Sequence, residues 1–280
     1  MPEREGFPAG VPSWIDIDRP NPEAAAAFYA ELFGWRFENR MPPGTPPYLV
    51  ATLDGREVAG IGMAVADGTS TPAWNTYIGV EDAAAMAARV RSAGGTVASE
   101  PADVGGLGRS AWCADPSGAA FRIWQPGSLA GAAVVNAPNS WNFSELHTRD
   151  PEEAGRFYRT VFGWEADVVD LGAMTGTMVR LPGYADFLEQ YDPGIRQRHL
   201  DFGAPPGFTE CIAWIHPLEG GEAPHWGVTF SVADTDAVAA RARELGGTVL
   251  VDPFDMPMVR SAVVQDPDGA VFSASAFNPG

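Results

Sequence analysis

The chain has 280 residues, of which 45% are hydrophobic, and its formal net charge is −18. This length exceeds the usual size of one hydrophobic core and favours two domains. The negative charge excludes nucleic acid and membrane surfaces as expected partners, because both are bound through basic patches.

Nothing in the sequence predicts export or a membrane span. Met1 to Gly10 has no apolar signal region, and no run approaches 18 apolar residues. Cys113 and Cys211 stand outside any Cys-x-x-Cys arrangement, so we expect reduced, buried thiols. These features predict a cytoplasmic protein.

The first hundred residues begin with a β-α-β-β-β pattern. Residues 1–12 show no periodicity and predict a short arm, and residues 13–18 alternate bulky and polar side chains as a strand does. Asn21 is a favoured N-cap before Pro22, and Gly34 is a natural helix end, so a helix is expected between them. Three strands should follow, at 35–39, 48–53 and 58–65.

The same plan recurs three times along the chain. A strand at 74–80, a helix capped by Asp82 and strands at 96–100, 110–114 and 119–125 form the second module. After a small-residue linker at 127–138, the third module opens with a strand at 141–147 and a helix starting at Asp150. The fourth has a strand at 226–232, a helix capped by Asp234 and three final strands.

Three signatures are present twice, which indicates a duplicated domain. FYAELFGW from Phe28 returns as FYRTVFGW from Phe157, and GGTV recurs as well. The turn DPSG from Asp115 returns as DPDG from Asp266. Phe157 lies 129 positions after Phe28, but Asp266 lies 151 positions after Asp115. About 22 extra residues therefore belong to the second half, near 184–210. We expect a short helix at 187–191 within this insertion, which would serve as a lid, a binding loop or a surface excursion.

Four such modules with paired FY-x-x-x-FGW and DP-S/D-G motifs resemble the vicinal oxygen chelate superfamily of glyoxalases, bleomycin-resistance proteins and extradiol dioxygenases. The likeness covers nearly the whole chain and looks closest to two-domain glyoxalase-like or hydroxylase proteins of actinobacterial type. It implies an α+β fold in which four βαβββ modules form two tandem glyoxalase/bleomycin-resistance-like domains, at 11–126 and 139–277. Members pair their clefts within or between chains, so a monomer or a homodimer is expected. Because this fold hosts isomerases, dioxygenases and drug binders, function depends on the site residues.

The resemblance also implies where metal-using members place their ligands. These positions lie seven residues before the helix-starting residue of a module and seven residues after the Asp of the DP-x-G turn. A divalent ion needs imidazole or carboxylate donors there. The corresponding residues here are Trp14, Asn75, Arg122, Phe143, Gly227 and Ser273. Since none is His, Asp or Glu and one is a cation, we predict no metal and no other cofactor.

The second half also permits an alternative metal site. Glu145 and His147 alternate on one strand, and His216 and His225 lie in neighbouring strands. A divalent metal held by these four residues would make the chain an enzyme, as a glyoxalase-like lyase or a dioxygenase or hydroxylase. More simply, Glu145 and its counterpart Asp16 are hydrogen-bonded carboxylates in the cleft.

Aromatic residues occupy the expected cleft. Indole rings can stack on a flat, amine-bearing ligand, Asp16 or Glu145 can fix its orientation, and Arg122 can pair with a ligand oxygen. Plain core packing is the other explanation for these tryptophans. The predicted ligand-binding set is Trp14, Asp16, Trp74, Asn75, Arg122, Trp124, Phe143, Glu145, Trp226 and Ser273.

The first functional hypothesis is a metal-independent protein that binds a small aromatic ligand, a natural product or drug. Its role would be sequestration, antibiotic resistance or hand-off to a biosynthetic enzyme. The enzyme with a displaced metal site is the alternative. A third hypothesis is that only one half binds a ligand, and the insertion favours the second half.

Overall fold

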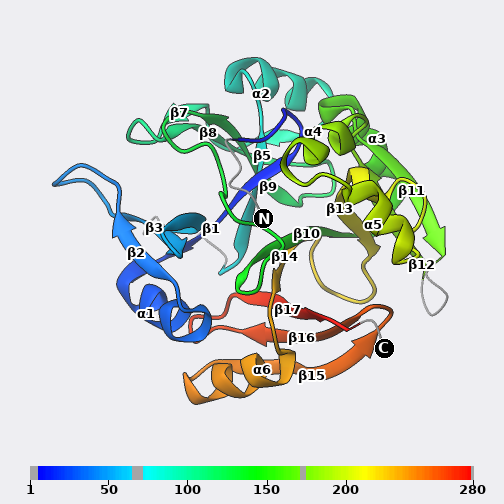
Figure 1. Ribbon diagram of the computed structural model, residues 1–280. Helices are drawn as coiled ribbons and strands as arrows, with labels where there is room; N and C mark the ends of the chain where they lie inside the picture. Colours follow the sequence, from blue (N-terminus) through cyan, green and yellow to red (C-terminus); the bar gives the residue numbers. More distant parts are fainter. Residues whose placement is uncertain (1–5, 65–71, 171–174, 279–280) are drawn as a thin grey trace. The chain divides into compact units, whose positions relative to one another are not determined.

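The computed structural model describes residues 6–64, 72–170 and 175–278. Its strands belong to one sheet of nine strands and one of eight, and helices complete an α+β fold (Figure 1). Contacts divide the chain into two compact units. Unit 1 comprises Met1–Ser13, Thr76–Ala130 and Phe143–Trp226, and unit 2 comprises Trp14–Asn75, Gly131–Asn142 and Gly227–Gly280. Each unit therefore combines one module from each half, whereas the predicted domains at 11–126 and 139–277 follow the repeat and stay a prediction.

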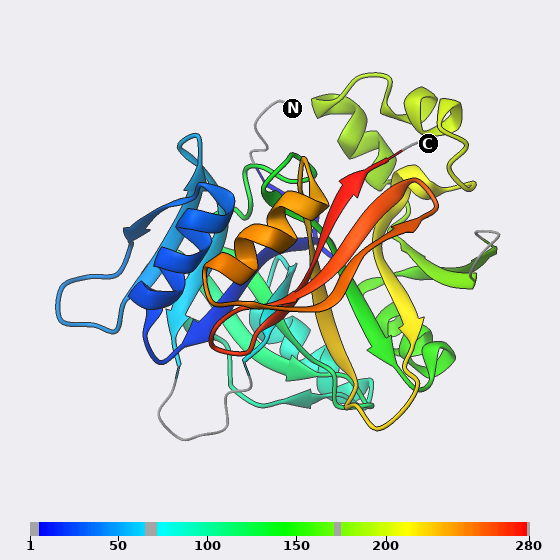
Figure 2. The ribbon, with the colours of Figure 1, turned by 90° about the horizontal axis from the view of Figure 1, so that it is seen from below.

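Unit 2 contains the first and last modules, except that Pro12, Ser13, His225 and Trp226 belong to unit 1, and unit 2 also includes Trp74, Asn75 and residues 140–142 of the middle modules. The first consists of β1 (Pro12–Arg19), α1 (Pro22–Phe33), β2 (Arg36–Asn39), β3 (Tyr48–Leu53) and β4 (Arg56–Met63). The last consists of β14 (His225–Ser231), α6 (Thr235–Glu244), β15 (Thr248–Met256), β16 (Val259–Gln265) and β17 (Val271–Phe277). The first strand of each module pairs in parallel with its last strand. Figure 2 shows α6 lying along β15, β16 and β17. Both modules have the predicted βαβββ order, although the end of the expected strand at 58–65 lies outside the described residues.

Unit 1 contains the two middle modules. The second module consists of β5 (Trp74–Gly79), α2 (Ala83–Ser92), β6 (Thr96–Val97), β7 (Ala102–Asp103), β8 (Gly108–Ala114) and β9 (Ala120–Pro126). The third consists of β10 (Ser140–Thr148), α3 (Pro151–Phe162), β11 (Glu165–Asp170), β12 (Thr175–Arg180) and β13 (Cys211–Pro217). The single strand expected at 96–100 is wrong. The N–H groups of Ala98 and Ser99 both donate to the carbonyl of Trp112, so two residues oppose one and the strand ends as a bulge.

Helices α1 and α3 begin where the sequence predicts, and α1 also ends there. The Asn21 side chain accepts from the Ala24 N–H at 3.1 Å, and Asp150 accepts from the Glu153 N–H at 2.8 Å. Gly34 has φ 74° and Gly163 has φ 77°, a left-handed conformation that glycine adopts without steric cost. No helix within the described ranges is long and apolar enough to cross a membrane.

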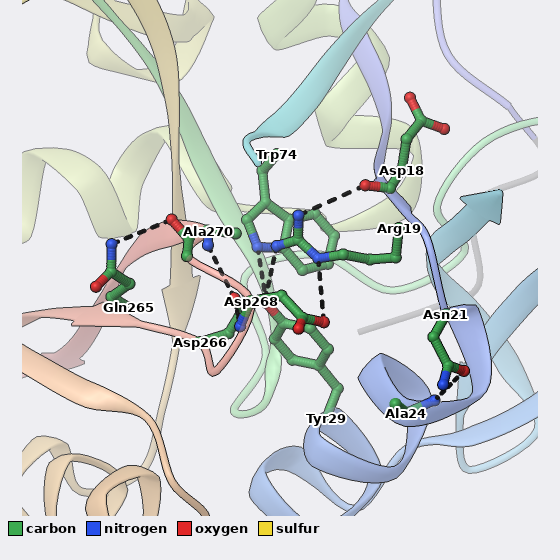
Figure 3. A network of polar contacts seen from close by, with 11 residues as sticks. Asp18, Arg19, Asn21, Ala24, Tyr29, Trp74, Gln265, Asp266, Asp268 and Ala270 are labelled. Carbon is green, nitrogen blue, oxygen red and sulfur yellow. Dashed lines mark hydrogen bonds and ion pairs between the residues drawn. The ribbon is translucent and has the colours of Figure 1, made fainter. Parts of the chain in front are cut away.

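The repeated motifs meet inside each unit. In unit 2 the Tyr29 hydroxyl donates to Asp266 Oδ2 at 2.9 Å, so the FY helix of the first half contacts the DP turn of the second (Figure 3). In unit 1 the Tyr158 hydroxyl donates to Asp115 Oδ2 at 3.3 Å, which joins the helix of the second half to the turn of the first. Burial raises the pKa of both tyrosines well above the usual value, and the neighbouring carboxylate adds to it. The motifs that repeat in the sequence are thus partners across the halves.

Among the residues that the structure describes, unit 2 alone adds a cation to this contact. Arg19 Nη2 lies 2.7 Å from Asp266 Oδ2, and both side chains are 2% exposed (Figure 3). The same carboxylate accepts from the backbone N–H groups of Asp268 and Ala270. Thr148 stands at the position of Arg19 in the third module. The halves therefore differ at a buried charge.

The insertion folds into three short helices in unit 1: α4 (Tyr184–Tyr191), α5 (Ile195–Asp201) and the 3₁₀-helix η1 (Phe208–Glu210) (Figure 1). The helix predicted at 187–191 is confirmed and starts earlier, whereas α5 was not predicted. Tyr184 and Leu188 of α4 are buried in the core of unit 1. At the other end of the insertion, Glu210 lies 3.2 Å from Arg180 of β12. Arg180 also pairs with Glu165 of β11 at 3.0 Å. The segment is anchored at both ends.

Candidate functional site

Asp16 on β1 is the centre of a polar network in unit 2. Its side chain is fully buried, and a carboxylate in that position requires hydrogen-bond donors. The Tyr48 hydroxyl donates to Oδ2 at 3.0 Å, and Asn75 Nδ2 donates to Oδ1 at 2.8 Å. The indole N–H of Trp14 in turn donates to the Tyr48 oxygen at 2.8 Å. The predicted residues Trp14, Asp16 and Asn75 thus lie together.

Two glycines on β4 make room for this network. A Cβ at Gly60 would lie 2.3 Å from the Tyr48 oxygen and 3.2 Å from Asp16 Cβ. A Cβ at Gly62 would lie 2.7 Å from Asp18 Oδ1. Any larger side chain at Gly60 would displace the tyrosine from the carboxylate. The two glycines on β4, which have no side chain, are therefore part of how Asp16 is held.

Arg122 on β9 is the centre of a second cluster, in unit 1. Tyr77 on β5 and Trp112 on β8 are its neighbours in strand register. The guanidinium carbon lies 4.3 Å from the ring centroid of Trp112, within cation–π range, and the guanidinium donates to the Tyr77 hydroxyl. Arg122 is 8% exposed, whereas Trp112 is 37% exposed. The cluster therefore combines a partly exposed indole with a largely buried cation.

Trp124, two residues after Arg122, is fixed in place. Its indole N–H donates to the carbonyl of Leu129 at 3.0 Å, and its ring lies at an edge-to-face angle to Tyr77. A Cβ at Gly108 would come within 2.5 Å of the indole. The ring is 3% exposed, so it offers a wall and not a stacking face.

Two of the predicted tryptophans pack in aromatic cores. Trp74 donates to the Tyr29 hydroxyl at 3.2 Å and lies edge-to-face with Phe230 in unit 2. Trp226 donates to the Tyr158 hydroxyl at 2.9 Å in unit 1. Both indoles are less than 5% exposed and serve the helix-to-turn contact of their units. Core packing accounts for these two rings.

Phe143, Glu145 and Ser273 are the remaining predicted site residues. Phe143 and Glu145 lie on β10 in unit 1, and each is half-buried. Ser273 lies on β17 in unit 2 and is in register with Thr229 of β14.

The three histidines of the alternative site gather in unit 1. His147 stacks on His225 with ring centroids 4.8 Å apart and on His216 at 5.5 Å. Burial, and then the charges of His225 and His216, together lower the pKa of His147 to about 4. Glu145 Oε2 lies 4.0 Å from His147 Nε2. The imidazoles therefore pack face to face, and the environment of His147 favours its neutral form.

Neither residue set fits a divalent metal ion. At the positions where the family places ligands, the Trp14 nitrogen is already donating to Tyr48, and Arg122 would repel a cation. In the histidine stack the ring faces meet, whereas metal binding requires ring nitrogens to converge at about 2.0 to 2.1 Å from one point. Within residues 6–64, 72–170 and 175–278, no group of three or more His, Cys, Asp or Glu is placed to hold a metal ion.

The two cysteines are buried, as predicted, and free. Burial raises the pKa of the Cys113 thiol to about 12 and that of Cys211 further above its usual value. A thiol that resists deprotonation is a poor nucleophile and a poor metal ligand. The cysteines therefore add nothing to a catalytic site.

Sequence reasoning missed Tyr48 and Tyr77, which hold Asp16 and Arg122. Their role depends on strand register, which joins residues far apart in sequence. One signal was visible: Gly60 and Gly62 are two residues apart in a strand, a pattern that indicates close approach of another side chain. For Tyr77 no such local signal exists.

Comparison with known proteins gives related families for the two halves. Residues 13–123 match the Glyoxalase/Bleomycin resistance protein/Dioxygenase superfamily, and residues 144–275 match the Glyoxalase-like domain. The chain is 36% identical over 277 residues to the candidate glyoxylase CFP32 of Mycobacterium tuberculosis (strain CDC 1551 / Oshkosh), covering 98% of this chain and 97% of that protein. It is also 36% identical over 290 residues to the anthracycline biosynthesis protein DauV of Streptomyces sp. (strain C5), covering 95% and 93%. The anthracycline biosynthesis protein DnrV of Streptomyces peucetius is 34% identical over 287 residues, with 98% and 96% covered.

Solved structures with little sequence identity have the same fold. The Mn(II)-bound glyoxalase from Novosphingobium aromaticivorans aligns with a TM-score of 0.61 at 16% identity, over 96% of this chain and 82% of that one. The 2,3-dioxygenase LapB from Pseudomonas sp. KL28 aligns with a TM-score of 0.61 at 12% identity, over 96% and 93%. At such identities the likeness extends to the fold alone.

Proposed function

The chain belongs to the glyoxalase/bleomycin resistance protein/dioxygenase superfamily, and on that premise we propose that it binds a planar aromatic small molecule without a metal ion. Its role would be sequestration, resistance or hand-off in the biosynthesis of a natural product. Members of this fold share an architecture but not one chemistry, so the proposal rests on side chains.

The observation that carries the proposal is Arg122. This cation stands where metal-using relatives place a ligand, and its guanidinium lies against the half-exposed ring of Trp112. A guanidinium supported by an indole and a phenol can pair with a carbonyl, phenolate or carboxylate oxygen, while the indole face stacks on a flat ring. This combination favours an oxygen-bearing aromatic ligand over a metal ion.

Two relatives support the ligand class. DauV and DnrV are named as anthracycline biosynthesis proteins, and each aligns with nearly the whole of this chain. Anthracyclines are planar, fused-ring aromatic compounds that carry several oxygens. A ligand of that shape would satisfy both an indole face and a guanidinium.

Asp16 is proposed as a separate acceptor for a ligand hydroxyl within unit 2. Its carboxylate is held by Tyr48 and Asn75, so its two oxygens are fixed before any ligand arrives. A prearranged acceptor costs little ordering entropy when a ligand hydroxyl binds. The network of Asp16, Tyr48 and Asn75 is thus proposed to accept a ligand hydroxyl independently of Arg122.

The proposal is tested by titrating the protein with an anthracycline and following the visible absorbance of the chromophore. Replacing Arg122 by methionine should weaken binding about 10- to 100-fold, the effect of losing about 1.5–3 kcal/mol in a hydrogen bond to a charged group. Arg122→Lys should also weaken it, because lysine keeps the charge but loses the planar fork. Arg109→Met is the matched control, since Arg109 is an exposed cation on β8 whose guanidinium donates to the backbone carbonyl of Pro101.

Elemental analysis of protein purified without chelators separates this proposal from the enzyme alternative. We expect less than one equivalent of any transition metal per chain and unchanged ligand affinity after chelator treatment. One bound equivalent that disappears in Glu145→Gln would overturn the proposal. It would instead favour a lyase or oxygenase built around Glu145, His147, His216 and His225.

A further inference from the structure

A cavity of about 450 Å³ lies in unit 1, apart from the cluster of Arg122 and Trp112. It is bounded by the N-terminal arm at Phe7, by Ser13, by Glu81 after β5, by Trp124 and Gln125 on β9, and by Ala130. Pockets of about 300–1,000 Å³ are the size that buries most of a small organic ligand. The site has the volume for one compact molecule.

Ser13 supplies the first sign that a ligand belongs here. Its side chain is 1% exposed, yet its hydroxyl oxygen has no hydrogen-bond partner in the described part of the chain. Buried hydroxyls are nearly always paired, since an unpaired one retains its desolvation cost. A polar group of a ligand in the cavity would supply the missing partner.

The negative charge at the wall, and not Gln125, favours a cationic ligand. Gln125 is fixed by its Oε1, which accepts from the N–H of Ala83 at 3.0 Å. Glu81 is exposed at the wall and contributes a negative charge. The chain as a whole carries a net charge of −18, which attracts cations toward such an opening. An anion would be repelled by Glu81 and by the net negative charge of the chain.

The apolar part of the wall is rigid. Trp124 is held by Leu129 through its indole nitrogen, and its ring is closely packed against Gly108. Phe7 and two prolines of the lining add apolar surface that cannot hydrogen-bond. The cavity therefore combines an apolar wall, a buried hydroxyl and a carboxylate.

We propose that this cavity binds a small aromatic amine, with the ring against Trp124 and Phe7 and the ammonium group donating to Ser13 Oγ and Glu81. This assignment does not depend on the aromatic ligand proposed for Arg122 and uses no residue of that cluster. It adds a second binding site with a different ligand charge.

Ligand-observed NMR with 2-phenylethylamine tests the proposal on the full chain, with 2-phenylethanol and 3-phenylpropionate as neutral and anionic comparators. The amine should bind saturably, with the alcohol about ten-fold weaker and the acid weaker still, as expected for a charge-assisted hydrogen bond. No saturable amine binding up to about 10 mM would overturn the proposal, because even a fragment-sized ligand in a real pocket reaches that affinity. Equal binding of the alcohol or the acid would overturn it too.

Three substitutions locate the binding. Glu81→Gln should weaken amine binding about ten-fold, whereas Glu219→Gln, which removes an equally exposed charge from the same unit, should not. Ala130→Phe should block binding by filling the cavity. Unchanged affinity in Glu81→Gln or Ala130→Phe would overturn the assignment.

Ser13→Ala distinguishes a binding role from a structural one. Removing an unpaired buried hydroxyl should leave the melting temperature unchanged or raise it, while amine affinity falls about five-fold. A lower melting temperature with unchanged amine affinity would show that the hydroxyl serves the fold and would overturn its place in the site. Arg122→Met should leave amine binding intact, so that failure of this site and failure of the proposed function are separately visible.

Discussion

Replacing Arg19 by methionine should destabilise unit 2, because it removes a buried cation from a buried carboxylate. Arg19 Nη2 lies 2.7 Å from Asp266 Oδ2, and both side chains are 2% exposed (Figure 3). Water cannot take the place of the lost guanidinium at such burial. The methionine fills much of the same volume, so the change is mainly one of charge.

The structure sets the size of the effect. Breaking a buried ion pair by removing one partner costs about 3–5 kcal/mol. Asp266 retains three donors: the Tyr29 hydroxyl and the N–H groups of Asp268 and Ala270. We therefore expect the lower end of that range, about 3 kcal/mol. Adding Asp266→Asn should recover about 1–2 kcal/mol, because a neutral amide no longer requires the cation.

Urea unfolding followed by tryptophan fluorescence measures these changes. Two units can unfold separately, so each transition is fitted on its own, and only that of unit 2 should shift. Thr148→Val is the matched control: Thr148 occupies the position of Arg19 in the third module, and its hydroxyl accepts a long, 3.5 Å hydrogen bond from the Asp150 N–H. That variant should lose at most about 1 kcal/mol. The reasoning is refuted if Arg19→Met unfolds at the wild-type midpoint, or if the double variant shows strictly additive losses.

Three further predictions concern unit 1. Gly155→Ala should raise the free energy of unfolding by about 0.5–1 kcal/mol, because the site is inside α3. The new Cβ would lie 3.5 Å from Ala166 Cβ, an ordinary van der Waals contact. A lower melting temperature in thermal unfolding would contradict this. His147→Gln should flatten the dependence of stability on pH between about 6.5 and 4. In wild type the folded pKa is lowered to about 4, so only the unfolded chain takes up a proton as the pH falls through that window, and stability is lost there. The shift of the His147 pKa corresponds to a loss of at most about 3 kcal/mol. Because the ring is 30% exposed, solvent makes the actual loss smaller. If His147→Gln leaves the slope of stability against pH unchanged, His147 is not the residue that causes the loss. Arg180→Met should speed chymotrypsin cleavage within 184–210, because Glu210 loses its cation, whereas Arg156→Met should leave the rate unchanged.

The fold was largely predictable because its signals are local. Asn21 and Gly34 set the ends of a helix within one turn of themselves, and the alternation at 13–18 needs no partner strand to be recognised. The strand at 96–100 was predicted wrongly because its length depends on what lies across the ladder. Ala98 and Ser99 share one carbonyl of Trp112, a pairing that no local pattern encodes.

The candidate site was harder to predict because neighbouring residues in a strand face opposite sides. Trp74 and Asn75 were placed in the same cleft by their order in the sequence, yet Trp74 joins the aromatic core while Asn75 donates to Asp16. Period-two alternation alone allows only one of the two on a given face. Which of them faces the core follows from Tyr29, a residue 45 positions away.

The repeat itself separates structural from functional residues. Tyr29 contacts Asp266 and Tyr158 contacts Asp115, so each half of the chain supplies one member of each pair, and both halves must keep both residues. The ligand positions of the family follow the opposite rule, because Trp14, Asn75 and Arg122 in the first half correspond to Phe143, Gly227 and Ser273 in the second. A contact shared between halves constrains both copies, whereas a binding residue constrains only the half that uses it. The positions at which the halves disagree are therefore where a ligand-specific role should be sought, and the one buried cation among those six, Arg122, lies in the first half.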